Sequence, residues 1–151
     1  MINDKLLMKG ELKLVLESPG KPDEVIETTN LVVDTGLAYI ASRMKDTADD
    51  VMTHMAIGAG TAAAAGTDTA LGSELARVAL TSTTIVTTTV TDDAIQYVAT
   101  FLPGVGTGAV TEAGTFNDGT AGTMLCRTVF DVINKGQYDT LTVTWKITIE
   151  A

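Results

Sequence analysis

The sequence predicts a mainly β domain, an antiparallel β-sandwich of the jelly-roll kind with one short helix. Threonine is the most common of the 151 residues, and β-branched side chains favour strands. Apolar and polar residues alternate over residues 11–17 and 140–149, with the period of two that a half-buried strand shows. Turn residues separate several short strand-like segments, and this spacing is typical of an all-β sandwich.

The chain is predicted to begin its regular structure with a hairpin and a helix. Residues 11–17 alternate in polarity, and residues 18–23, which contain Pro and Gly, are predicted to form a turn. Residues 24–30 are expected to return as the second strand of the hairpin. Apolar residues at helical spacing then predict a helix over residues 35–44. Either Asp34 or Thr35 is expected to cap its first turn.

A buried strand and a long loop of small residues are expected next. The strand is predicted over the apolar residues 51–57. Residues 58–69 contain only Gly, Ala, Thr and one Asp, which predicts a loop, the alternative being a helical turn over residues 61–65. A short turn over residues 70–75 is expected to tuck its two leucines inward.

The rest of the chain is a succession of predicted strands. They cover residues 78–91, 95–101, 110–116, 123–133 and 140–149, with turns at residues 92–93, 103–108, 117–119 and 134–136. The total is about eight strands. In the last of them Leu141, Val143, Trp145, Ile147 and Ile149 are expected to share one face. A parallel sheet would need a helix between successive strands, so the pairing is predicted to be antiparallel.

Composition excludes several partners and predicts the folding compartment. The formal net charge of −9 disfavours nucleic acid and anionic lipid, and no run of about 18 apolar residues predicts a membrane span. Cys126 is the single cysteine, so no disulfide can form within the chain. Residues 1–5 lack the basic start and apolar run of a signal peptide, which favours synthesis in a reducing cytoplasm.

One motif resembles a nucleotide site but lacks the necessary context. The segment Gly58-Ala59-Gly60-Thr61-Ala62-Ala63 fits the G-x-G-x-x-A pattern after an apolar strand. Such glycines let a backbone approach a pyrophosphate at the start of a helix. No βαβ unit surrounds the segment, so a loop is the preferred interpretation.

Other reactive residue types have simpler explanations. His54 and Cys126 could form a nucleophilic pair only if the fold joined them, and a packed or exposed histidine and a buried cysteine are favoured. The acidic loop of Asp46, Asp49 and Asp50 does not have the spacing of an EF-hand calcium loop. Trp145 is predicted to be a core residue rather than a binding platform. We therefore expect no enzymatic activity, no cofactor and no metal.

Four blocks of sequence carry a resemblance to a known family. They are Asn30-Leu31-Val32-Val33 followed by Gly36-Leu37, Met55-Ala56-Ile57-Gly58-Ala59-Gly60, Thr69-Ala70-Leu71-Gly72-Ser73-Glu74-Leu75-Ala76-Arg77, and much of residues 111–145. In this order they resemble small virion proteins of tailed bacteriophages, over most of residues 30–149. The resemblance implies a structural protein located in the virion, and no catalytic residues.

The expected function is non-enzymatic binding within a phage particle. The leading interpretation is a capsid decoration (cement) protein that binds the shell of major capsid protein, or other virion proteins, as a homo-oligomer. The first alternative is a tail- or fibre-associated module. The second, ranked below it, is a carbohydrate-binding module for the host surface. The carbohydrate interpretation is weakened because aromatic residues make up only 5% of the chain.

The N-terminal segment is the predicted partner interface. Residues 1–10 are expected to form an arm ahead of a sandwich domain over residues 11–151. Its apolar side chains would pack on a neighbouring molecule, and they are Ile2, Leu6, Leu7 and Met8.

Overall fold

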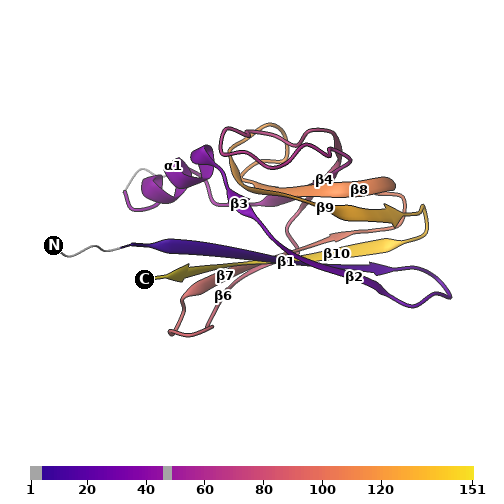
Figure 1. The fold of residues 1–151 in the computed structure, drawn as a ribbon, viewed down its shortest axis with the longest axis horizontal. Coiled ribbons are helices and arrows are strands. Elements are labelled where there is room, and N and C mark those ends of the chain that lie inside the picture. The colour runs from indigo at the N-terminus through magenta and orange to yellow at the C-terminus, as the bar shows by residue number, and fades with distance from the viewer. Residues whose placement is uncertain (1–4, 46–48) are drawn as a thin grey trace.

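The computed structural model describes residues 5–45 and 49–151, which form two stacked antiparallel sheets and a helix (Figure 1). One sheet, here sheet A, contains β1 (Leu7–Glu17), β2 (Glu24–Thr29), β6 (Ser82–Val86), β7 (Ala94–Phe101) and β10 (Thr140–Glu150). The other, sheet B, contains β3 (Leu31–Val32), β4 (His54–Gly58), β5 (Glu74–Ala79), β8 (Gly108–Phe116) and β9 (Met124–Lys135). Helix α1 spans Asp34–Ser42.

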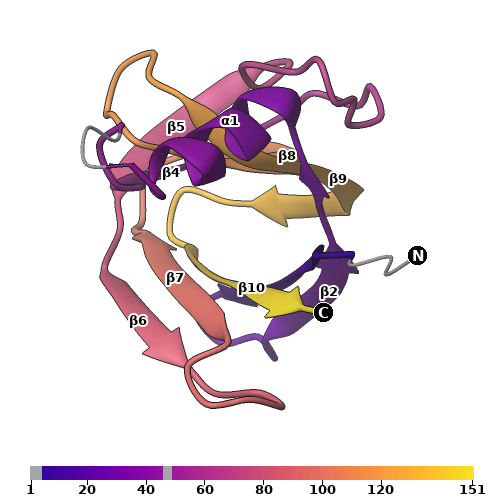
Figure 2. The same ribbon diagram turned by 90° about the vertical axis from the view of Figure 1, so that its left-hand side faces the viewer.

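The strand order confirms the predicted sandwich. Sheet A has the order β2-β1-β10-β7-β6 and sheet B the order β3-β9-β8-β4-β5. The chain crosses between the sheets after β2, β5, β7 and β9. Figure 2 shows sheet A below and sheet B above, with α1 in front of sheet B because the helix lies at one end of the sandwich in Figure 1.

The described part of the chain has ten strands, where the sequence predicted about eight. One added strand is the short β3, which pairs with β9. The other arises because the predicted strand over residues 78–91 divides where the chain changes sheets. The Leu80 amide donates to Thr53 O beside sheet B, and the next amide, of Thr81, donates to Val98 O in sheet A.

The core lies between the sheets and follows the predicted alternation. Leu12, Leu14 and Leu16 of β1 are buried, as are Leu141, Val143, Trp145 and Ile147 of β10. Ile149 is the exception, with 46% of its surface exposed. The predicted face of the last strand is therefore confirmed from Leu141 to Ile147 but not at Ile149.

The helix is confirmed, but its predicted caps are wrong. The helix begins at Asp34, and its N-cap position is Val33. Neither Asp34 nor Thr35 caps it, because no side chain hydrogen-bonds to the first amides of the helix. The Thr35 hydroxyl instead donates to Met124 O of β9 at 2.9 Å. Gly36 lets the helix lie this close, because a Cβ there would overlap the Leu125 carbonyl. The Thr35 hydroxyl is therefore engaged by β9 and does not cap the helix.

Part of the predicted N-terminal arm belongs to sheet A. β1 begins at Leu7, which pairs with Glu150, so residues 7–10 lie in the sheet rather than in an arm. Gly10 hid this extension, because it breaks the alternation of polarity. Gly10 is needed there, since a Cβ would overlap the side chain of Asn30, whose Oδ1 accepts a hydrogen bond from Trp145 Nε1 at 2.9 Å.

Candidate functional site

Three of the predicted interface residues, Leu6, Leu7 and Met8, lie where β1 starts. Leu6 and Leu7 are largely exposed, at 70% and 57%, and Met8 is half-buried against the core. The prediction for Ile2 concerns a position outside the described residues. The exposure of Leu6 and Leu7 leaves them free to contact another molecule.

Leu6 lines a groove together with the β6–β7 loop and the last residues of β10. This end groove has a volume of about 710 Å³ and is lined by Leu6, residues 89–93 and residues 149–151. Val90 is 65% exposed, and Ile149 is 46% exposed. Three large apolar side chains from distant parts of the sequence therefore share one solvent-facing depression.

The β6–β7 loop that forms one wall of the end groove is held by a single carboxylate. Asp93 accepts hydrogen bonds from the amides of Thr88, Thr89 and Val90 at 2.7–2.9 Å and from the Thr88 hydroxyl at 2.8 Å. These bonds, that of the Val90 amide first, hold the pKa of the Asp93 carboxyl far below its usual range. The Ile149 amide donates to Asp93 O at 2.9 Å, which ties the loop to β10. Val90 is thus presented on an ordered loop.

A second feature, which the sequence did not predict, is a largely buried ion cluster between sheet B and the loop that joins β4 to β5. The cluster consists of Glu112, Arg127 and Asp68. Arg127 Nη2 lies 2.8 Å from Glu112 Oε2, and Arg127 Nη1 lies 2.8 Å from Asp68 Oδ2. The side chains of Arg127 and Glu112 are 3% and 0% exposed. This cluster fixes the long loop between β4 and β5.

Glu112 binds both ends of that loop. Its carboxylate accepts the amides of Gly60, Gly72 and Ser73 at 2.7–2.9 Å. Arg127 donates to the Ala62 carbonyl from the same side. Burial raises the pKa of the Glu112 carboxyl, but the amides and Arg127 outweigh it and hold that pKa below its ordinary value.

The glycine motif at residues 58–63 is explained by this arrangement. A Cβ on Gly60 would overlap the Glu112 carboxylate, and one on Gly58 would crowd it. The glycines do bring a backbone close to an anion, as in a phosphate-binding loop, but the anion is a side chain of the same protein. The predicted loop is confirmed, and the alternative helical turn over residues 61–65 is wrong.

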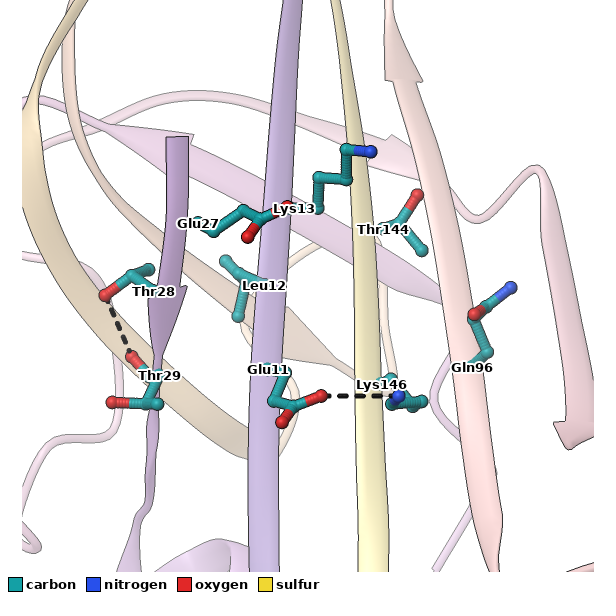
Figure 3. A pocket seen from close by; sticks show the side chains of 9 residues that line it. All are labelled: Glu11, Leu12, Lys13, Glu27, Thr28, Thr29, Gln96, Thr144 and Lys146. Atoms are coloured by element: carbon teal, nitrogen blue, oxygen red, sulfur yellow. Dashed lines mark hydrogen bonds and ion pairs between the residues drawn. The ribbon is translucent and has the colours of Figure 1, made fainter. Parts of the chain in front are cut away.

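The outer face of sheet A carries a third candidate, a polar groove of about 510 Å³ (Figure 3). Its charged side chains are of both signs, and Lys146 Nζ lies 3.3 Å from Glu11 Oε2. Its full lining is Glu11, Leu12, Lys13, Glu27, Thr28, Thr29, Gln96, Thr144 and Lys146. None of these side chains is aromatic, so the groove lacks the ring on which a sugar would stack.

The remaining residues singled out by the sequence have structural environments. Cys126 and Trp145 are fully buried, and burial raises the pKa of the Cys126 thiol to about 12, which keeps it protonated. The half-buried His54 ring lies 2.8 Å from the Thr53 hydroxyl through Nδ1. Of the acidic loop, Asp46 lies outside the described residues, while the Asp49 and Asp50 carbonyls accept hydrogen bonds from Arg43 and Asn117.

Neither similarity to known proteins nor a cluster of metal ligands among the described residues points to a function. No family model, curated protein or solved structure matches this chain. Among residues 5–45 and 49–151, no three His, Cys, Asp or Glu side chains lie together as metal ligands would. No helix in that part of the chain has the length and apolar character to span a membrane.

Proposed function

We propose that this protein is a non-enzymatic structural protein of a tailed-phage virion, and specifically a capsid decoration protein. In this proposal the end groove docks on the outer surface of the shell of major capsid protein. The observation that carries the proposal is the gathering of Leu6, Val90 and Ile149 in one exposed groove beside an ordered loop. The resemblance of residues 30–149 to phage virion proteins supports the choice of partner.

The perturbed acids support a structural rather than a chemical role. The pKa of each of Glu112, Asp68 and Asp93 is lowered, which keeps these groups ionised. Each one holds a loop by accepting backbone amides. A general acid or base needs a pKa near the working pH, and these shifts run in the opposite direction.

The end groove can contribute useful but limited binding energy. Complete burial of one large apolar side chain stabilises a complex by about 1.5–3 kcal/mol. Because Asp93 already orders the loop that carries Val90, little entropy is lost there on binding. A stable interface needs roughly 1,000 Å² or more, so contacts beyond the groove, or many copies on one shell, must share the attachment.

A binding assay on preformed shells tests the proposal. The variant Leu6→Ser/Val90→Ser removes two groove side chains, and Val25→Ser is the matched control because Val25 is a 50% exposed apolar residue on β2. Shells that lack the protein are mixed with each form and sedimented, and the bound copies are counted. We expect the groove variant to bind at least about tenfold more weakly, the equivalent of one partly buried side chain, and the control to bind normally.

Two outcomes would overturn parts of the proposal. Equal binding by the groove variant and the wild type would exclude the end groove as the docking surface. If the intact protein never binds shells but copurifies with tails, the tail-associated module replaces the decoration protein.

A further inference from the structure

The four sheet edges differ in how they are protected from other strands. Edge strands of natural proteins usually carry charges that discourage pairing. β2 carries Glu24 and Glu27, and β5 carries Glu74 and Arg77. Among the edge strands in the described part of the chain, β6 is the only one longer than two residues without a charged side chain.

The unprotected stretch extends well beyond β6. No charged residue occurs from position 78 to position 91 in a chain whose net charge is −9. Four of the five residues of β6 are exposed, and the fifth is half-buried. Figure 2 shows β6 at the outer margin of sheet A, with β7 on its inner side. Two acidic molecules would repel each other least along such an edge.

The exposed Ile85 ends an apolar row that runs across sheet A. Ile147 of β10 pairs with Ile95 of β7, and Ile95 pairs with Ile85 of β6. Exposure increases along this row, from 1% at Ile147 to 60% at Ile85. The row therefore ends at the edge with a side chain that has a neighbour on one side only.

We propose that β6 is a self-association edge, which pairs antiparallel with β6 of a second copy of this chain about a two-fold axis at Ile85. In this register Ile85 lies opposite its symmetry mate, and Thr84 lies opposite Val86 of the second copy. The apolar row then continues from one molecule into the other, and sheet A becomes a ten-stranded sheet across the pair. A two-fold contact of one edge with itself closes at the dimer.

A second copy fits this edge because the segment is complementary to itself. Residues directly opposite in an antiparallel pair share a face, and the two Ile85 side chains would face each other where each is now exposed. Thr83 lies beside Ile85 on the same face of β6, whereas Thr84 and Val86 pair on the opposite face. These residue types suit cross-strand pairs. The pairing uses five residues from each copy, so the free dimer is expected to be weak and to matter at high local concentration. The inference does not depend on the virion role.

Cysteine cross-linking in the full chain tests the edge directly. Opposite residues in an antiparallel pair have Cα atoms about 4.5–5.5 Å apart, which is within the range of roughly 4.4–6.8 Å that a disulfide spans. The native Cys126 does not interfere, because it is fully buried. Under mild oxidation, Ile85→Cys should form a covalent dimer at least about tenfold faster than the control Val25→Cys, which lies on the charged edge β2.

A charge substitution provides the second measurement. Ile85→Lys would place two ammonium groups opposite each other across the axis, which is unfavourable, whereas Val25→Lys leaves β6 unchanged. By sedimentation equilibrium, we expect the dimer dissociation constant to rise at least about tenfold for Ile85→Lys only. Circular dichroism verifies that each variant is folded. The proposal is overturned if folded Ile85→Cys does not cross-link, if it cross-links no faster than Val25→Cys, or if both lysine variants associate like the wild type.

Discussion

Replacement of Arg127 by Ala should lower the free energy of unfolding by about 3–5 kcal/mol, because it leaves a buried carboxylate without its cation. Glu112 is 0% exposed, and Arg127 donates to it from Nε at 3.1 Å and from Nη2 at 2.8 Å. Three amides still hydrogen-bond Glu112 in the variant, which favours the lower end of the range. A domain of this size has a total stability of about 5–15 kcal/mol, so the loss is a large fraction.

The predicted loss corresponds to a fall in Tm of about 6–20 °C at roughly 2–4 °C per kcal/mol for a domain of this size. Urea unfolding followed by fluorescence of the buried Trp145 measures it. Lys146→Ala is the matched control, because Lys146 is 32% exposed in its ion pair with Glu11, and a solvated pair contributes at most about 1 kcal/mol.

A double variant distinguishes the buried charge from the loss of packing. Glu112→Gln combined with Arg127→Ala removes the unpaired charge and should recover at least about 1 kcal/mol relative to Arg127→Ala alone. An Arg127→Ala variant within about 1 kcal/mol of the wild type, or a double variant no more stable than the single one, would refute the assigned role of the ion cluster.

The same carboxylate makes stability depend on pH in the acid range. The pKa of Glu112 is lower in the folded protein than its ordinary value of 4.5, so the unfolded chain takes up a proton at higher pH than the folded chain. The resulting stabilisation is fully present above pH 4.5 and is lost as the pH falls through the folded pKa. Glu112→Gln should therefore reduce the slope of unfolding free energy against pH below 4.5, and an unchanged slope in urea titrations would contradict this.

Three further predictions concern the core. Gly10→Ala should displace the Asn30 side chain from Trp145. This should lower the free energy of unfolding by about 1–3 kcal/mol and alter the fluorescence emission of the tryptophan. Unchanged stability and emission would contradict the assigned contact. Lys135→Met should be neutral within about 1 kcal/mol or stabilising in thermal unfolding at pH 7, because burial disfavours the ammonium and lowers its pKa. A loss above about 2 kcal/mol would show that the ammonium and its hydrogen bond to Leu102 O stabilise the fold. Cys126 should react with a thiol reagent at least about a hundredfold more slowly in the folded protein than in urea, and equal rates would show that the site opens readily.

The sandwich could be predicted because its signal is local. The alternation in β1 and β10 results from side chains that point to opposite faces of one strand, so neighbouring residues suffice to predict it. The start of β1 was missed because Gly10 serves a contact with Asn30, twenty residues further along the chain. A contact between residues so far apart in the sequence produces no pattern of alternating polarity from which it could be predicted.

The ion cluster could not be predicted because its members are joined only by the fold. Arg127 lies 15 positions from Glu112 and 59 from Asp68, and three of the hydrogen bonds to Glu112 come from backbone amides. One sequence signal was present, since Glu112 is the only charged residue of the predicted strand over residues 110–116, and Arg127 lies within the predicted strand over residues 123–133. A charge in a buried strand calls for a partner, although the sequence does not say which one.

Leu6 is the one predicted interface residue, among those the structure describes, that lines the end groove. Leu6 and Leu7 stood out as apolar residues ahead of the first regular strand, and they are exposed as a partner interface requires. Val90 was not singled out, because it lies in a threonine-rich stretch. The conformation that exposes Val90 depends on the hydrogen bonds that the Asp93 carboxylate accepts from the loop amides. The sequence Asp92-Asp93 predicted a turn at this place but not these hydrogen bonds.

If the chain is encoded by a phage, as proposed, electron microscopy of the purified particles of that phage tests the decoration role most directly. A decoration protein predicts many copies over the shell at symmetry-related positions, each with the end groove of Leu6, Val90 and Ile149 against the major capsid protein. Density for the chain at the tail or at a single vertex, or its absence from purified particles, would contradict the decoration role.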